Sequence, residues 1–150
     1  MLVYRITSSK YSSDISGTGA ALFPGRWNKI GTPVLYTGES KEIALLEVLV
    51  HVQAGIVPEL DILTIEIPDN SIHELKIKDL PAKWAEYPAP AILRERGEKW
   101  VREGVSLALK VPSSIISSSF ILILNCRHKD YGKIKIRDKR KFHLDLRLIK

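Results

Sequence analysis

One carboxylate interrupts an otherwise apolar stretch of the sequence. Glu47 lies in the run from Ile43 to Val50, whose other members are all apolar. A carboxylate inside a buried helix carries a large desolvation cost, or shifts its pKa, unless something compensates it. At 100° per residue, Ser40, Glu47 and His51 fall within about 40° of one another and form a polar seam. The seam is either a solvated stripe or the lining of a cleft in which Glu47 is a working carboxylate.

An arginine flanked by glycine and tryptophan is the second candidate. Arg26 lies in the predicted turn Pro24-Gly25-Arg26-Trp27-Asn28. Glycine permits close backbone approach to a ligand, and a guanidinium offers paired donors that suit a phosphate. A structural arginine stacked on Trp27 is the alternative. The sequence has neither a Gly-rich dinucleotide fingerprint nor a Walker loop, so a nucleotide would have to bind in another way.

A tyrosine and a serine are weaker candidates. Tyr36 lies near the end of the predicted strand 34–37, where it is either a half-buried core residue or a ring that stacks on a planar ligand. Ser113 lies in the turn 112–114, where serine is common. No Gly-x-Ser-x-Gly elbow surrounds Ser113, which argues against a hydrolase nucleophile.

The remaining reactive residue types do not form a recognisable site. The four histidines lack metal-ligand spacing, so we expect no metal site. Cys126 is the single cysteine, which excludes an internal disulfide and favours a reducing compartment. The sequence contains neither a signal peptide nor an apolar run that could span a membrane, so we expect a cytoplasmic protein.

The elements around these residues predict an α+β fold in one compact domain, residues 1–150, with short mixed strands and a buried central helix. That helix is predicted from Ser40, as N-cap, to Ala54, with Gly55 as its stop. A second helix is predicted over 91–102, ended by Gly104. Strands are predicted over 3–6, 34–37, 62–67, 106–111 and 120–124.

The positive charge is confined to the C-terminal segment. The chain has a net charge of +6, all of it contributed by residues 129–150. Apolar and basic residues alternate there, which predicts a basic β-hairpin over about 131–149 with Arg137–Lys141 as its connection. A basic face this local suits an acidic partner or an anionic ligand as well as nucleic acid, and it could also be a solubilising surface.

Taken together, these segments resemble the RES domain, named for an Arg, a Glu and a Ser. The resemblance is carried by residues 25–28, 31–40 and 44–51, and more weakly by 107–113 and 124–128. It implies a fold similar to ADP-ribosyltransferases and a toxin of a toxin–antitoxin pair. It also implies cleavage of the nicotinamide–ribose bond of NAD⁺. The partner would be an antitoxin of Xre type that blocks the site, and any contact with DNA would be made by the antitoxin.

The resemblance assigns roles to particular residues. Glu47 would stabilise the ribose cation, Arg26 would bind the pyrophosphate, and Tyr36 would stack on nicotinamide or ribose. Ser113 would hydrogen-bond near the phosphate or ribose, with Arg5 and Asn125 as further binding candidates. The chain departs from the family pattern at three positions, which are Pro24, Ile121 and Cys126.

Three functions remain open at this level. The first is cleavage of NAD⁺ with water or inorganic phosphate as acceptor, that is, a glycohydrolase or phosphorylase. The second is ADP-ribosyl transfer to a protein. The third is a non-enzymatic binding module that uses the basic C-terminal segment.

Overall fold

A single mixed sheet of seven strands organises the chain in the computed structural model, which describes residues 1–53 and 55–149. The strand order is β4-β5-β6-β2-β1-β3-β7, with β4 and β5 parallel and the other neighbours antiparallel. The strands are β1 (Leu2–Ser8), β2 (Val34–Gly38), β3 (Leu60–Glu66), β4 (Ile72–Glu74), β5 (Ala108–Pro112), β6 (Phe120–Asn125) and β7 (Lys135–Phe142). The helices are α1 (Thr18–Leu22), α2 (Lys41–Leu49) and α3 (Ala91–Glu103). The predicted α+β class is confirmed.

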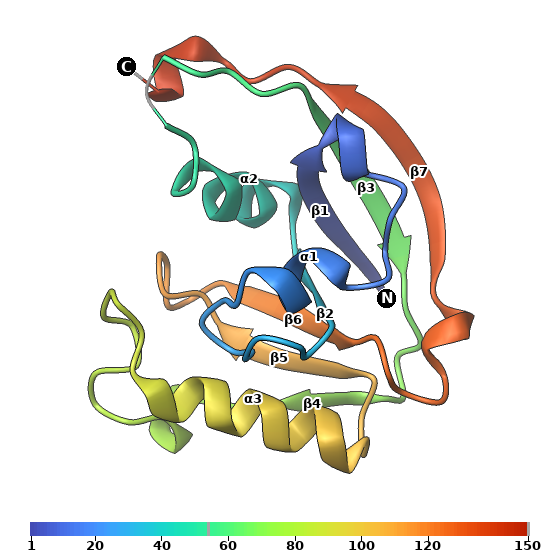
Figure 1. Ribbon diagram of the computed structural model, residues 1–150, viewed down its shortest axis with the longest axis vertical. Helices are drawn as coiled ribbons and strands as arrows, with labels where there is room; N and C mark the ends of the chain where they lie inside the picture. Colours follow the sequence, from blue (N-terminus) through green and yellow to red (C-terminus); the bar gives the residue numbers. More distant parts are fainter. Residues whose placement is uncertain (54, 150) are drawn as a thin grey trace.

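The sheet divides into two halves that diverge from a narrow junction (Figure 1). β1 meets β2 at the single register pair Tyr4 and Gly38, whereas β1 pairs with β3 along its whole length. Arg5 bridges the junction, because its Nη1 donates a 2.9 Å hydrogen bond to the carbonyl of Tyr36. One half therefore holds β7, β3 and β1, and the other holds β2, β6, β5 and β4.

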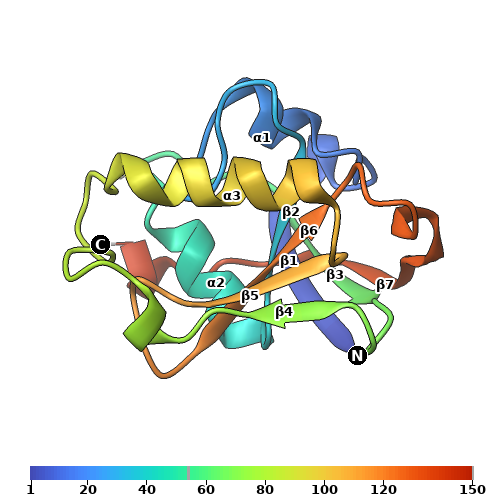
Figure 2. The ribbon, with the colours of Figure 1, turned by 90° about the horizontal axis from the view of Figure 1, so that it is seen from below.

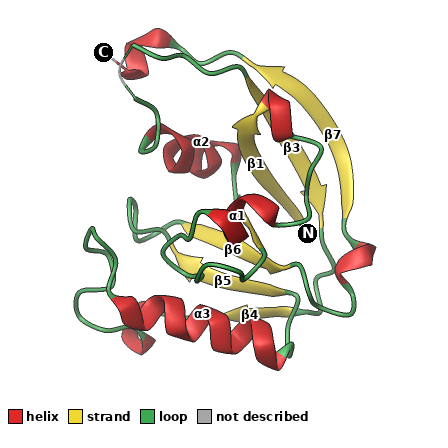
Figure 3. Cartoon of the chain, viewed as in Figure 1, coloured by secondary structure: helices red, strands yellow, loops and turns green. Residues whose placement is uncertain are grey.

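Different helices cover the two halves. α3 lies across β4, β5 and β6 (Figure 2), and its Leu93 and Trp100 pack with Leu109 and Ile123 of those strands. α2 packs against β1, β2 and β6, in the angle between the halves (Figure 3). The second predicted helix is confirmed, since α3 ends before Gly104, whose φ of +62° favours glycine.

The central helix is shorter and more exposed than the sequence predicts. Ser40 is its N-cap as expected, and its hydroxyl accepts a hydrogen bond from the Ile43 amide at 3.2 Å. The helix ends at Leu49, however, and only Ile43 and Ala44 are fully buried. The remaining apolar residues of α2 pack against the core but stay partly exposed, so the prediction of a helix that is buried on nearly every side is wrong. The expected helix end at Ala54, like the terminal Lys150, lies outside the described residues.

The predicted C-terminal hairpin is wrong. Residues 135–142 form one continuous strand, β7, which pairs antiparallel with β3 and places the expected connection, Arg137–Lys141, inside the strand. Short 3-10 turns precede and follow it, at Tyr131–Lys133 and Leu146–Ile149. An edge strand has the same alternating pattern as a hairpin arm, and the predicted connection Arg137–Lys141 lacks the Gly or Asn that a tight turn favours. Lys and Arg on such an edge oppose unwanted pairing with other chains.

Candidate functional site

Glu47 and Ser113, 66 residues apart in sequence, are hydrogen-bonded to each other. The Ser113 hydroxyl donates to Glu47 Oε1 at 2.9 Å. Its oxygen accepts from the amides of Ile115 and Ile116, at 3.1 and 3.4 Å. Because these two N–H groups use the lone pairs of the oxygen, the single hydroxyl proton is directed to the carboxylate. Among the described residues, Glu47 Oε2 has no hydrogen-bond or ion-pair partner.

The fold positions this pair by joining two elements. α2 presents Glu47 on its half-exposed side, and Ser113 directly follows β5 at the start of the loop to β6. The Ser113 amide donates to the carbonyl of Ser119 at 2.8 Å, which closes that loop. The Ser113 side chain is fully buried, so its hydroxyl orients Glu47 from the protein interior. The sequence had predicted a contact of Ser113 with ribose or phosphate.

Arg26 lies in electrostatic range of Glu47. Its Nη1 donates to two main-chain carbonyls, Trp84 O at 2.7 Å and Glu86 O at 2.9 Å. Burial lowers the pKa of the Arg26 guanidinium, and the negative charge of Glu47 acts in the opposite direction. Arg26 Nε and Nη2 have no protein partner in the part of the chain that the structure describes. The Arg26 side chain is thus held through Nη1, while Nε and Nη2 are available to a ligand.

The turn that carries Arg26 is fixed by a buried asparagine. Asn28 is fully buried, and its Oδ1 accepts hydrogen bonds from the Gly25 amide at 2.9 Å and from the Tyr36 hydroxyl at 2.6 Å. The Tyr36 oxygen in turn accepts from the Trp27 amide at 3.1 Å. Burial raises the pKa of Tyr36, so the phenol stays protonated and can donate to Asn28. A Cβ at Gly25 would lie 2.7 Å from the Tyr36 oxygen, which explains the glycine.

Tyr36 therefore holds the Arg26 turn through its hydroxyl, a role that the sequence did not predict. Its ring lies near both charges of the candidate site, Arg26 and Glu47. Asn28 has the same positioning role, and its place in the motif after Arg26 was the available signal. Gly97 is a third such residue, because a Cβ there would lie 1.6 Å from the carbonyl of Trp27 and would push α3 away from the turn.

Two predicted binding residues lie elsewhere and bond to the backbone. Arg5 bridges the sheet junction, and burial lowers the pKa of its guanidinium, which lies near Tyr131 and Cys126. Asn125 is fully buried, and its Nδ2 donates to the carbonyl of Val101 in α3 at 3.1 Å. The structure brings together Arg26, Tyr36, Glu47 and Ser113. Arg5 contacts this group only through the main-chain carbonyl of Tyr36, and Asn125 has no hydrogen bond to it among the described residues.

The other residues considered in the sequence lie outside the Glu47–Ser113 pair. His51 is exposed beyond the end of α2. Ile121, which was expected to depart from the family pattern, packs in the core beneath α3. Burial raises the pKa of Cys126, which disfavours a reactive thiolate. Within 1–53 and 55–149, no group of three or more His, Cys, Asp or Glu side chains could hold a metal ion, and no helix is long and apolar enough to cross a membrane.

Two surface hollows lie away from this group of residues. Two hollows of about 350 and 370 Å³ lie along α3, and charged side chains such as Glu98 and Arg102 line both of them. Neither is lined by Glu47, Ser113 or Arg26. The chemical argument for the site therefore rests on its side-chain contacts.

Several curated proteins resemble the chain over most of its length. A protein named Toxin Res from Photorhabdus laumondii is 41% identical and covers 100% of this chain and 98% of its own. Toxin Res of Yersinia enterocolitica is 38% identical, covering 87% and 88%. A protein named Prs ADP-ribosylating toxin, from a Sphingobium strain, is 33% identical, covering 93% and 89%.

A solved structure shares the fold. The crystal structure of the M. tuberculosis MbcT–MbcA toxin–antitoxin complex contains a chain that matches with a TM-score of 0.78 and 19% identity, covering 94% of this chain and 83% of that one. The family model of the RES domain matches residues 2–145, and this range includes every residue of the candidate site. The chain belongs to the RES domain family.

Proposed function

We propose that this chain is the toxin of a toxin–antitoxin pair and that it cleaves the nicotinamide–ribose bond of NAD⁺. The observation that carries the proposal is the carboxylate of Glu47, which Ser113 holds at one oxygen and which is open at the other. The guanidinium of Arg26, which uses only Nη1 for hydrogen bonds within the described residues, lies in electrostatic range of the Glu47 carboxylate. A cation-stabilising group and an anion-binding group within electrostatic range of each other are what a dinucleotide with a cationic leaving group requires. The names of the Toxin Res relatives support the toxin assignment.

The chemistry needs charge stabilisation more than proton transfer. The bond between the ribose carbon and the nicotinamide nitrogen breaks with its electron pair on the nitrogen, so the cationic ring leaves neutral and needs no proton. The ribose then develops positive charge, which the Glu47 carboxylate stabilises through its open oxygen. Ser113 keeps that carboxylate in place. Arg26 binds the diphosphate, and this contact fixes the scissile bond next to Glu47.

The acceptor decides the product. A water oxygen that bonds to the ribose carbon gives ADP-ribose and releases one proton, whereas inorganic phosphate gives the corresponding sugar phosphate. A protein side chain as acceptor gives an ADP-ribosylated protein, and the name of the Sphingobium relative favours this second candidate function. A binding module would have to use the basic residues of an edge strand, since residues 135–142 form β7 and not a hairpin.

The partner is proposed to be an antitoxin of Xre type. The fold relative was solved as a toxin–antitoxin complex, which supports an antitoxin partner for this chain. An antitoxin that covers Glu47 and Arg26 would suppress turnover by excluding NAD⁺.

Product analysis tests the proposal. Purified protein is incubated with adenine-labelled NAD⁺, with and without phosphate, and with a cell extract. We expect stoichiometric release of nicotinamide, with label in ADP-ribose, in the phosphorylated sugar or on a macromolecule according to the acceptor. Absence of nicotinamide release under all three conditions would overturn the proposed activity.

A further inference from the structure

A second arginine contacts the turn that carries Arg26. Arg94 lies in the first turn of α3 and is half-buried. Its Nε donates a 3.0 Å hydrogen bond to the carbonyl of Gly25, the residue that immediately precedes Arg26. The Arg94 guanidinium therefore lies against the Gly25–Arg26 peptide bond, although it comes from an element 69 residues away in sequence.

The charge of Arg94 has no acidic partner among the described residues. Glu98, one turn further along α3, forms its ion pair with Lys29 at 3.0 Å, and Glu95 lies 3.7 Å from the same lysine. The first turn of α3 contains no acidic residue. The N-terminus of a helix carries a partial positive charge, so a cation there is unfavourable unless an anion compensates it.

Two guanidinium groups thus lie near one hydroxyl. The positive charges of both Arg94 and Arg26 act on the Tyr36 phenol. Each arginine spends one nitrogen on main-chain carbonyls and leaves two nitrogens without a partner in residues 1–53 and 55–149. Glu47 is the carboxylate that acts on Arg26, and one carboxylate cannot balance two guanidinium groups.

We propose that Arg94 is a second anion-binding residue, which binds a diphosphate together with Arg26. The Gly25 carbonyl orients the Arg94 guanidinium, and its terminal amino groups donate to one phosphate while Arg26 donates to the other. Planar guanidinium groups suit this contact because each can donate two parallel hydrogen bonds to phosphate oxygens. The identity of the diphosphate as part of NAD⁺ rests on the proposed function, whereas the anion site itself does not.

Glutamine separates the two roles of this side chain. In Arg94→Gln, the amide nitrogen lies the same number of bonds from the backbone as the arginine Nε, so the donor to Gly25 is retained while the charge and the terminal amino groups are removed. Arg94→Met removes the donor as well. Arg102→Gln, on the exposed side of the same helix, is the matched control for loss of one positive charge.

Titration calorimetry with ADP as the diphosphate probe tests the proposal without any need for turnover. Hydrogen bonds to charged groups contribute about 1.5–3 kcal/mol, so Arg94→Gln is expected to weaken ADP binding by about 10- to 100-fold. Its melting temperature should stay near that of the wild type, and Arg102→Gln should bind ADP normally. For NAD⁺ turnover, KM should rise more than kcat falls.

Two results would overturn the inference. Unchanged ADP affinity in Arg94→Gln would reduce Arg94 to a structural contact, especially if Arg94→Met alone lost affinity and stability. An equal loss in Arg102→Gln would mean a general charge effect. The fate of the proposed function is separate, because Arg94-dependent ADP binding without nicotinamide release would retain the anion site and reject the cleavage activity.

Discussion

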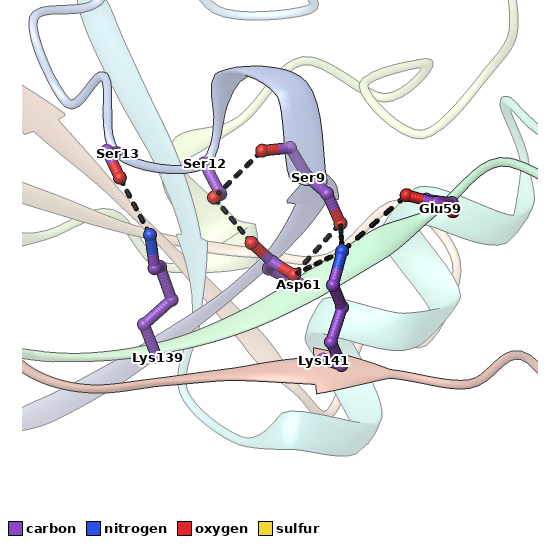
Figure 4. A network of polar contacts seen from close by, with 7 residues as sticks. All are labelled: Ser9, Ser12, Ser13, Glu59, Asp61, Lys139 and Lys141. Carbon is purple, nitrogen blue, oxygen red and sulfur yellow. Dashed lines mark hydrogen bonds and ion pairs between the residues drawn. The ribbon is translucent and has the colours of Figure 1, made fainter.

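Asp61 and Glu47 each receive hydrogen bonds from serine hydroxyls that lie far away in sequence, and the two carboxylates have opposite surroundings. Asp61, on β3, accepts from Ser9 at 2.9 Å and from Ser12 at 2.6 Å, one on each oxygen, with the Lys141 ammonium 3.9 Å away (Figure 4). Glu47, on α2, accepts from one serine on one oxygen. The same long-range contact between a serine hydroxyl and a carboxylate is therefore saturated at Asp61 and open at Glu47.

The difference in saturation separates structure from function. Asp61 is buried, and the Ser12 and Ser9 hydrogen bonds lower its pKa. The carboxylate ties the turn at Ser9–Ser12 to β3 and, through Lys141, to the edge strand β7. Glu47 is half-buried, and its second oxygen is left to face a ligand. A buried polar group with all its partners stabilises a fold, whereas one with an unused acceptor beside a cation is a candidate for chemistry.

The sharpest test of this comparison is Glu47→Gln. The amide keeps the shape of the side chain and can still accept from Ser113, but it loses the charge that would stabilise the ribose cation. Removal of such a stabilising group typically costs about 10²–10³ in rate, so nicotinamide release should fall by that factor with the melting temperature nearly unchanged. Undiminished release by this variant would refute the role of Glu47.

Removal of the serine at the open site should have an intermediate effect. Ser113→Ala leaves Glu47 charged but no longer oriented, so kcat should fall by about tenfold, part of the free energy that a hydrogen bond to a charged group contributes. KM for NAD⁺ should change little, because Ser113 is too deeply buried to contact the substrate.

Ser113→Thr is the matched control, because it restores the hydroxyl. Recovery of kcat in Ser113→Thr would identify orientation of Glu47 as the role of the side chain. Equal loss of kcat and of melting temperature in both variants would instead point to a packing role for this position.

At the saturated site, stability should change and activity should not. Asp61→Asn removes the charge that Ser9, Ser12 and Lys141 surround, so the melting temperature should fall while kcat per folded molecule stays constant. Asp138→Asn, on the neighbouring strand, is the control, since that carboxylate is more exposed and pairs with Arg140. A loss of activity in Asp61→Asn at temperatures where it is fully folded would contradict the comparison.

The effect of Asp61→Asn on the melting temperature should depend on pH. The pKa of Asp61 is lower in the folded chain than its ordinary value of 3.8, so this carboxylate stabilises the fold above that value. Its contribution is lost as the pH falls through the lower, folded pKa. The difference in melting temperature between wild type and Asp61→Asn should therefore be largest above pH 3.8 and shrink in acid; a difference independent of pH would oppose the assignment.

The sequence predicted the elements that depend on local signals. Ser40 caps α2 and Gly104 ends α3 because capping needs only neighbouring residues. The C-terminal segment could not be assigned locally, since its partner is β3, some 75 residues earlier, and alternation alone does not name a partner strand.

The candidate site shows the same limit. Glu47 stands out in an apolar run, whereas the part that Ser113 plays depends on a contact across 66 residues. The sequence does not distinguish Arg94 as a functional residue, because it resembles any other charged residue of an amphipathic helix. Its relation to Gly25 arises from the packing of α3 against the Arg26 turn, which Gly97 permits.

The smallest expected effect separates the contribution of Lys141 to the Asp61 contacts from that of the two serines. Lys141 is largely exposed, and its ammonium also lies 3.6 Å from Glu59 and 3.2 Å from the Ser9 hydroxyl. Exposed ion pairs are weak and are screened by salt, so Lys141→Met should lower the melting temperature much less than Asp61→Asn. At about 1 M salt, Lys141→Met should melt at the same temperature as the wild type. Thermal unfolding of both variants at low and high salt measures this. If Lys141→Met were as damaging as Asp61→Asn at both salt concentrations, the lysine and not the serines would hold the carboxylate, and serine donors would no longer be the feature that Asp61 and Glu47 share.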